Sequence, residues 1–146
     1  MNIPKHYFDI VPLEERVCSD GSAIGWIPII PIINYCNKNL IPFDLNINLL
    51  NLEGIELNEK NNLYNLIRYI KTIDNQDLSF PIIMSSNGMI IDGTHRITKA
   101  ILNNIDIIKC YKLPKTIYEL VNIDNLINLD ENVIFDYLNN EDVSED

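Results

Sequence analysis

A histidine and an arginine follow a glycine turn in the segment Asp92-Gly93-Thr94-His95-Arg96. An apolar run precedes this segment, and a stretch with helical spacing follows it. A helix that begins after Gly93 presents unpaired backbone N–H groups and the positive end of its dipole. Anions bind at such helix ends, and the side chains of Thr94, His95 and Arg96 can add hydrogen bonds to phosphate oxygens. The segment therefore predicts a phosphate-binding turn.

The same residues also have ordinary structural interpretations. Asp92 can act only as a helix cap, and Arg96 can simply pair with one of the many carboxylates. His95 can be a packed core histidine, and Lys99, one turn later, can reach a phosphate or stay in solvent. The context favours the anion site, because the pattern follows a strand, opens a helix and leads to another strand.

Composition and charge limit the classes of function. The chain has 146 residues and is 47% hydrophobic, which predicts one domain with a real core. Eleven basic against 21 acidic residues give a formal charge of −10. This charge argues against direct DNA binding and suggests a basic protein partner. The sequence has no apolar run long enough for a bilayer and no signal-peptide pattern, so we expect a cytoplasmic protein.

The cysteines point to neither a zinc site nor a disulfide framework. Cys18, Cys36 and Cys110 are odd in number and widely spaced, and no CxxC pair occurs. Reduced thiols are typical of a cytosolic protein.

The first half of the chain predicts short strands, turns and one helix. Residues 6–11 predict a strand, and residues 18–25 predict turns. Residues 26–35 are apolar but contain Pro28 and Pro31, which predicts an edge strand or an extended segment.

Residues 39–52 predict a strand that leads into a loop. Residues 57–73 predict an amphipathic helix with Asn58 as its cap. Its expected apolar face consists of Leu63, Leu66, Ile67, Ile70 and Ile73.

The second half begins with the elements that position the turn. Residues 79–92 predict a β-hairpin, because two apolar runs flank an Asn-Gly pair. A helix over 94–103, with Ile97, Ala100 and Ile101 facing inward, and a strand over 105–113 follow. Two helices, over 115–129 and 131–140, complete the chain before an acidic tail. The predicted fold class is α+β.

The stretch "FPIIMSSNGMIIDGTHRITKAILNNIDIIKCYKL" (80–113) resembles the core of the ParB/sulfiredoxin superfamily. The helix before it and the segment "LIPFDLN" match that family's order of strand, loop, helix and hairpin. The resemblance implies a small mixed sheet with flanking helices and a single domain. Its core would cover about 40–113, with an N-terminal extension over 1–39 and extra C-terminal helices over 114–146.

Two branches of the superfamily fit the motif poorly. Sulfiredoxins have G-C-H-R, and Thr94 stands where their reactive cysteine is required, so sulfinic-acid repair is not expected. ParB partition proteins have G-E-R-R-x-R-A and a downstream helix-turn-helix, whereas this motif has one arginine. A chromosome-partition role is therefore not expected either.

The motif is most similar to the D-G-H-x-R or D-G-x-H-R patterns of the free serine kinases and related small proteins. This resemblance implies that Thr94, His95 and Arg96 hold nucleotide phosphates and that Asp92 orients substrate or magnesium. It also implies an acidic base near the chain start, for which "DIVPLEERV" offers Glu14 and Glu15. If the family's first strand is instead "LIPFDLN", Asp44 takes the acidic role.

Three functions follow from these observations. The first is a phosphotransferase or nucleotide hydrolase that uses ATP or ADP with Mg²⁺ on a small hydroxyl-bearing substrate. The second is a non-catalytic module that senses a nucleotide or binds a partner protein. The third is a small phage or plasmid effector that mimics the charge of nucleic acid.

Overall fold

The computed structural model describes residues 16–55 and 62–129, which form an α+β arrangement as predicted. The α-helices are α1 (Ile29–Asn39), α2 (Leu63–Asp74), α3 (Thr94–Leu102) and α4 (Ile117–Asn122). The strands are β1 (Val17–Cys18), β2 (Ile27–Pro28), β3 (Phe43–Asn46), β4 (Ile82–Met84), β5 (Ile90–Asp92) and β6 (Ile107–Lys112). Two 3-10 turns, η3 (Ile47–Leu49) and η4 (Leu52–Gly54), follow β3.

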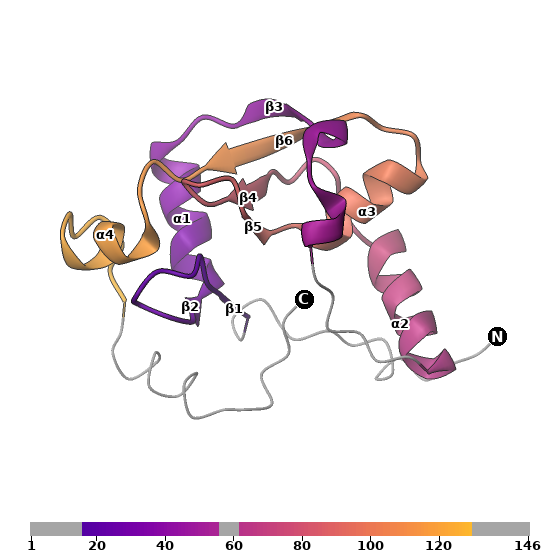
Figure 1. Cartoon of the computed structure of the whole chain (residues 1–146), viewed down its shortest axis with the longest axis horizontal. Coiled ribbons are helices and arrows are strands. Elements are labelled where there is room, and N and C mark those ends of the chain that lie inside the picture. The colour runs from indigo at the N-terminus through magenta and orange to yellow at the C-terminus, as the bar shows by residue number, and fades with distance from the viewer. Residues whose placement is uncertain (1–15, 56–61, 130–146) are drawn as a thin grey trace.

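A four-stranded mixed sheet lies at the centre of the described residues (Figure 1). Its strand order is β3-β6-β4-β5, and only the β4–β6 pair is parallel. Between the parallel strands β4 and β6 the chain passes through β5 and α3, so these two elements form the crossover connection. Strands β1 and β2 form a separate antiparallel ribbon.

The sheet is covered on both faces because side chains alternate along its strands. In β4, Ile83 belongs to the buried cluster with α1, the β1–β2 ribbon and α4. Its neighbours Ile82 and Met84 belong to a second cluster with α3. Both sides of the central strands are therefore core.

The prediction of an edge strand over 26–35 was wrong beyond its first residues. Only Ile27 and Pro28 pair as β2, and the helix α1 begins at the next residue. Pro31 lies in the first turn of α1, where a missing N–H removes no intrahelical hydrogen bond. The buried residues of α1 follow helical three- and four-residue steps: Ile29, Ile32, Tyr35 and Cys36.

The predicted hairpin, the helix after it and the following strand are confirmed. Strands β4 and β5 pair antiparallel around a turn in which Gly88 has φ +91°. Helix α3 buries Ile97 and Ala100 as expected, but Ile101 is 39% exposed, so its inward placement was wrong. Strand β6 is buried at positions on both faces.

Helix α2 is present, but most of its predicted inward face is exposed. Leu63, Leu66 and Ile70 are about half exposed or more, and Ile73 is buried. The apolar arc extends beyond the side that α3 covers, so periodicity alone overestimated the buried face. Asn62 caps the described helix by accepting a hydrogen bond from the Asn65 N–H.

Several expectations lie wholly or partly outside the described residues. These are the strand over 6–11, the cap at Asn58 and the helix over 131–140. Within 115–129 the structure has the short helix α4. The strand expected within 39–52 is the four-residue β3. The proposed domain boundaries stay a prediction.

In the described part of the chain, none of the helices has both the length and the apolar composition that crossing a bilayer requires.

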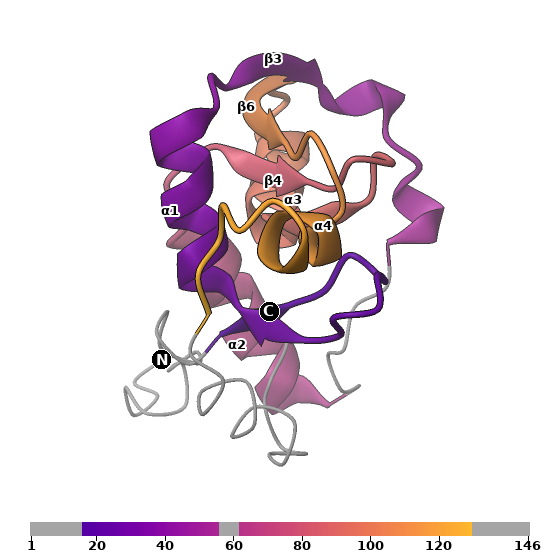
Figure 2. The ribbon, with the colours of Figure 1, turned by 90° about the vertical axis from the view of Figure 1, so that its left-hand side faces the viewer.

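A carboxylate far away in sequence adds a second cap to α4, beside the Thr116 side chain that accepts a hydrogen bond from the Glu119 N–H. Asp20 accepts hydrogen bonds from the Ile117 N–H (2.8 Å) and from the Ser22 hydroxyl (2.5 Å). Figure 2 shows α4 beside the loop between β1 and β2 that carries Asp20. Burial alone would raise the pKa of Asp20, but these hydrogen bonds outweigh it and lower the pKa below its usual value.

We predict that Asp20→Ala lowers the free energy of unfolding by about 1 kcal/mol, the usual cost of a lost helix cap. Because the pKa of Asp20 is lowered on folding, its stabilisation is present above the ordinary carboxyl pKa. It is lost as pH falls through the folded-state value. Urea unfolding of parent and variant at pH 7 and at acid pH should therefore converge at acid pH. Asp44→Ala, which removes an exposed ion pair with Lys109, is the control. An unchanged difference between parent and Asp20→Ala across pH would contradict the cap.

Candidate functional site

The glycine turn is fixed by close packing against β4. Gly93 has φ +117° and ψ 16°, and it caps α3 without a side-chain hydrogen bond. A Cβ added at this position would lie 2.3 Å from Cγ2 of Ile82. Glycine is therefore needed for its left-handed backbone and for the space it leaves. Both requirements place the end of β5 and the start of α3 in one defined orientation.

Asp92 and Arg96 form a largely buried ion pair across this turn. Their side chains are 14% and 12% exposed, and Arg96 Nη2 lies 2.6 Å from Asp92 Oδ2. Arg96 Nη1 donates to the backbone carbonyls of Pro81 (2.8 Å) and Phe80 (3.2 Å). The guanidinium thus ties the first turn of α3 to the end of β5 and to the segment before β4.

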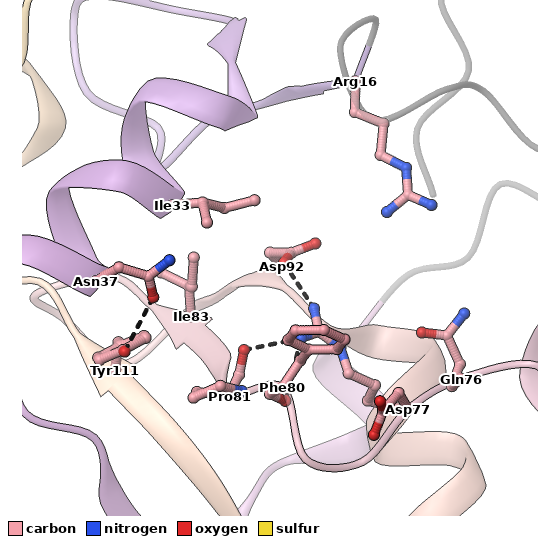
Figure 3. Close-up of a pocket in the computed structure, with 11 residues that line it drawn as sticks. Arg16, Ile33, Asn37, Gln76, Asp77, Phe80, Pro81, Ile83, Asp92 and Tyr111 are labelled. Atoms are coloured by element: carbon pink, nitrogen blue, oxygen red, sulfur yellow. Dashed lines mark hydrogen bonds and ion pairs between the residues drawn. The ribbon is translucent and has the colours of Figure 1, made fainter.

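A pocket of about 280 Å³ opens beside this pair (Figure 3). Its floor is a row of three side chains across the sheet, because Ile83 pairs with Tyr111 on one side and with Asp92 on the other. Helix α1 contributes Ile33 and Asn37 to the wall. The pocket therefore lies between the sheet and α1, with Asp92 on its floor.

The rest of the wall comes from residue 16 and from the segment before β4. This part includes Arg16, Gln76, Asp77 and the 64% exposed Phe80. Figure 3 shows the Arg16 guanidinium on the same side of the pocket as the Asp92 carboxylate. Hydrogen bonds from the Ser79 hydroxyl and N–H lower the pKa of Asp77, which favours its charged form. The charged part of the wall thus combines two arginines with two carboxylates.

The acidic charge of the chain is not carried by the described part. Residues 16–55 and 62–129 contain nine acidic and nine basic side chains, so the formal −10 belongs to the other segments. A phosphate that approaches the pocket therefore meets a surface with balanced charge in the described residues. The expectation that the chain does not bind DNA used the charge of the whole chain, and it stays a prediction.

His95 and Lys99 face α2 and do not line the pocket. The His95 side chain is buried, and its ring lies edge-on to Tyr69 at 5.3 Å between centroids. Lys99 Nζ donates to the carbonyls of Asp74 (2.9 Å) and Gln76 (2.6 Å), at the C-terminal end of α2. A cation there satisfies carbonyls that the helix leaves unpaired. In this conformation both residues join α3 to α2.

The other predicted site residues are Thr94, Glu14, Glu15 and Asp44, of which the structure describes Thr94 and Asp44. Thr94 is partly buried, and its backbone carbonyl accepts a hydrogen bond from the Thr98 hydroxyl. Glu14 and Glu15 lie outside the described residues. Asp44 is exposed on the edge strand β3, pairs with Lys109 at 2.6 Å and does not line the pocket.

The sequence interpretation missed the residues that complete the pocket. Arg16, just before β1, Asn37 in α1 and Tyr111 in β6 come from three separate parts of the chain, and no motif joins them. Tyr111 donates a hydrogen bond to Asn37 across 74 positions of sequence. Pairing across the sheet and packing of α1 bring these residues together, and neither signal is local.

Metal ligation at the pocket is limited to carboxylates. The described residues contain no group of three or more His, Cys, Asp or Glu side chains placed to hold a metal. Asp92 Oδ1 has no hydrogen-bond partner among them, so it can accept a bond from a hydroxyl or ligate a cation. Mg²⁺ is commonly bound by one or two carboxylates together with substrate phosphates and water. Among the described residues the pocket thus offers two carboxylates, Asp92 and Asp77, which do not make a complete metal site by themselves.

The cysteines near Asp92 are poor nucleophiles. All three are buried and free. Burial, with smaller effects of Cys110 and Asp92, raises the pKa of Cys36 to about 12. Burial is also the main cause that raises the pKa of Cys18, with a further contribution from Asp92. Neither thiol supplies the thiolate that Thr94 lacks at the turn.

Comparisons with protein-family models, with curated proteins and with solved structures give no match to this chain. The resemblance to the ParB/sulfiredoxin superfamily thus depends on the residues of the chain themselves.

Proposed function

We propose that this chain is a cytoplasmic nucleotide-binding protein with a ParB/sulfiredoxin-like fold. It transfers or hydrolyses a phosphoryl group of ATP or ADP, with Mg²⁺, and its acceptor is a small hydroxyl-bearing molecule or water. The observation that supports this proposal best is the position of Asp92. Its carboxylate lies on the floor of a pocket, at the start of a helix that can bind an anion.

The arrangement of elements supports the fold part of the proposal. The β4–β5 hairpin, α3 and the parallel strand β6 follow one another in the order typical of the superfamily core. The segment "LIPFDLN" contributes β3 to the same sheet. Helix α1 adds a layer that belongs to the N-terminal extension and forms one wall of the pocket.

Phosphoryl transfer requires mainly that the reactants are positioned and that their charge is neutralised. The first N–H groups of α3, together with Arg96 and Arg16, would hold phosphate oxygens. Asp92 would orient the acceptor hydroxyl through Oδ1 or bind magnesium. His95 and Lys99 would act indirectly, by holding α2 against α3, unless they exchange their present partners for phosphate.

The first test of the proposal is a thermal-shift screen. The ligands are ATP, ADP, CTP, GTP, AMP and pyrophosphate, each with magnesium. A ligand at 100 times its Kd stabilises the native state by about 2.7 kcal/mol, which gives a clear rise in Tm. A flat screen at millimolar ligand would contradict nucleotide binding.

For a nucleotide that binds, we predict that Asp92→Asn lowers the rate of phosphoryl transfer or hydrolysis at least about 100-fold. Because Asp92→Asn also removes the ion-pair partner of Arg96, the variant should be less stable, and its turnover is compared with that of the parent at a temperature at which both are folded. Turnover is measured by release or transfer of phosphate, and affinity by calorimetry. Asp77→Asn, at the same pocket, is the matched control and should keep most activity. Equal turnover in the parent and Asp92→Asn would remove Asp92 from the mechanism.

Glu14→Gln and Glu15→Gln test the proposed base in the same assay.

One observation favours a second candidate, a non-catalytic nucleotide-sensing or protein-binding module. Arg96, His95 and Lys99 all have intramolecular contacts, so the turn has fewer cations available than its sequence indicates. Such a module would bind a nucleotide without turnover, and the acidic segments outside the described residues would contact a basic partner protein. Nucleotide binding without measurable turnover, in the parent and in the variants of Asp92, Glu14 and Glu15, would support this candidate.

A further inference from the structure

The pocket has two polar ends separated by an apolar centre. Tyr111, Ile83 and Asp92 stand next to one another on three paired strands, β6, β4 and β5. Adjacent strands are about 4.8 Å apart, so the Tyr111 and Asp92 positions are separated by about 10 Å. The Asp92 end carries the charged groups, whereas the Tyr111 end is formed by a phenol and an amide.

The amide of Asn37 is held in one orientation. The Tyr111 hydroxyl donates to Asn37 Oδ1 at 3.0 Å. Figure 3 shows the amide nitrogen of Asn37 on the side away from Tyr111. Among the described residues no acceptor binds this NH₂ group, and Asn37 lines the pocket. Asn37 is exposed, so this NH₂ group faces solvent at the pocket and is available to a ligand.

Ile33 and Ile83 lie between the two ends. Ile33 projects from α1, and Ile83 projects from the sheet below it (Figure 3). Ile83 is 3% exposed and Ile33 packs against the core cluster that contains Ile83, so together they give the centre of the pocket an apolar surface. Such a surface suits an uncharged group of a ligand. The volume of about 280 Å³ is small for a ligand site and suits one compact molecule.

We propose that Asn37, oriented by Tyr111, is a specificity-determining residue that recognises the uncharged end of the bound nucleotide. Its NH₂ group donates to a carbonyl oxygen or ring nitrogen of the base, which lies in the pocket against Ile33. The phosphate lies at the other end, near Arg96 and Arg16. The inference depends on the proposed function, because it assigns the base of the nucleotide that the turn binds.

The test compares two ligands that differ only in the base. Calorimetry gives the Kd of a nucleoside 5′-monophosphate, chosen as the tighter binder of AMP and CMP, and of ribose 5-phosphate. Asn37→Leu removes the donor, keeps a similar shape and adds no charge. We expect it to weaken nucleoside monophosphate binding up to about tenfold, the effect of losing one hydrogen bond. The Kd of ribose 5-phosphate should change less than about twofold.

Tyr111→Phe tests the positioning role separately. Without the phenol hydroxyl the Asn37 amide can rotate while the fold is kept. The Kd of ribose 5-phosphate divided by the Kd of the nucleoside monophosphate should therefore fall about threefold. This ratio is informative because a general loss of structure would weaken the binding of both ligands and leave the ratio unchanged. Asn39→Leu is the control, since Asn39 lies on the same helix, binds the Tyr35 carbonyl and does not line the pocket. Its ratio should equal that of the parent.

The outcomes separate the two proposals. If both ligands bind and Asn37→Leu leaves the ratio of Kd values unchanged, the assignment of Asn37 is wrong and the phosphate site is retained. If neither ligand binds the parent chain, the proposed nucleotide function fails, and the base assignment fails with it.

Discussion

Replacing Gly93 with alanine is expected to lower the free energy of unfolding by about 3 kcal/mol or more. The new Cβ would lie 2.3 Å from Cγ2 and 2.7 Å from Cβ of Ile82, and the Ile82 backbone is 3.2 Å away. Overpacking of this kind costs about 1–3 kcal/mol, and the left-handed backbone adds about 1–2 kcal/mol for a residue with a Cβ. The measurement is chemical denaturation followed by circular dichroism.

Gly88→Ala is the matched control for this prediction. Gly88 also has a positive φ, +91°, but a Cβ there would meet no atom within 4 Å. Its substitution should cost only about 1–2 kcal/mol, from backbone strain alone. If the two variants lose equal stability, the close approach of Gly93 to β4 does not exist in solution. The position of Asp92 and Arg96 around the turn would then need revision.

The second large effect is expected at Arg96. Arg96→Leu leaves the Asp92 carboxylate without its ion-pair partner, although its side chain is only 14% exposed. Removing one member of a buried pair costs about 3–5 kcal/mol, because the other charge stays buried and uncompensated. The Pro81 and Phe80 carbonyls also lose their donor. We therefore expect a large fall in the free energy of unfolding, together with loss of nucleotide binding.

Lys109→Leu provides the comparison for Arg96→Leu. Lys109 and Asp44 are also 2.6 Å apart, but their side chains are 52% and 64% exposed, so their pair should contribute less than about 1 kcal/mol. The double variant Asp92→Asn with Arg96→Leu should recover part of the loss, since it removes both charges. Equal costs for Arg96→Leu and Lys109→Leu would show that the buried pair is not formed in solution.

The part of the fold that could be predicted from sequence is the part set by local signals. The Asn-Gly turn defined the hairpin, and Gly93 marked the start of α3. Helix α1 was missed because prolines were weighed as strand breakers, whereas Pro31 lies where a helix tolerates it. The exposed face of α2 was misjudged. Periodicity shows that a helix is amphipathic, but it does not show how much of the apolar face another element covers.

Helical spacing explains how the turn divides its side chains. Within α3, His95 and Lys99 are four residues apart and lie together against α2, whereas Arg96 points to the pocket, where it pairs with Asp92 at the end of β5. The sequence identified all four as one site, although they are directed to two sides. Asn37 belongs to the pocket only because α1 packs over the sheet, and no local pattern carried that information.

A titration followed by two-dimensional ¹⁵N–¹H NMR tests the central claim most directly. With ADP and Mg²⁺ added to saturation, the largest shift changes should fall on the backbone amides of Thr94, His95 and Arg96, at the start of α3. The amides of α4, which contributes no residue to the pocket lining, should move little. Absence of any shift at millimolar ADP, or shifts confined to residues away from the turn at Gly93, would contradict a phosphate site at this helix.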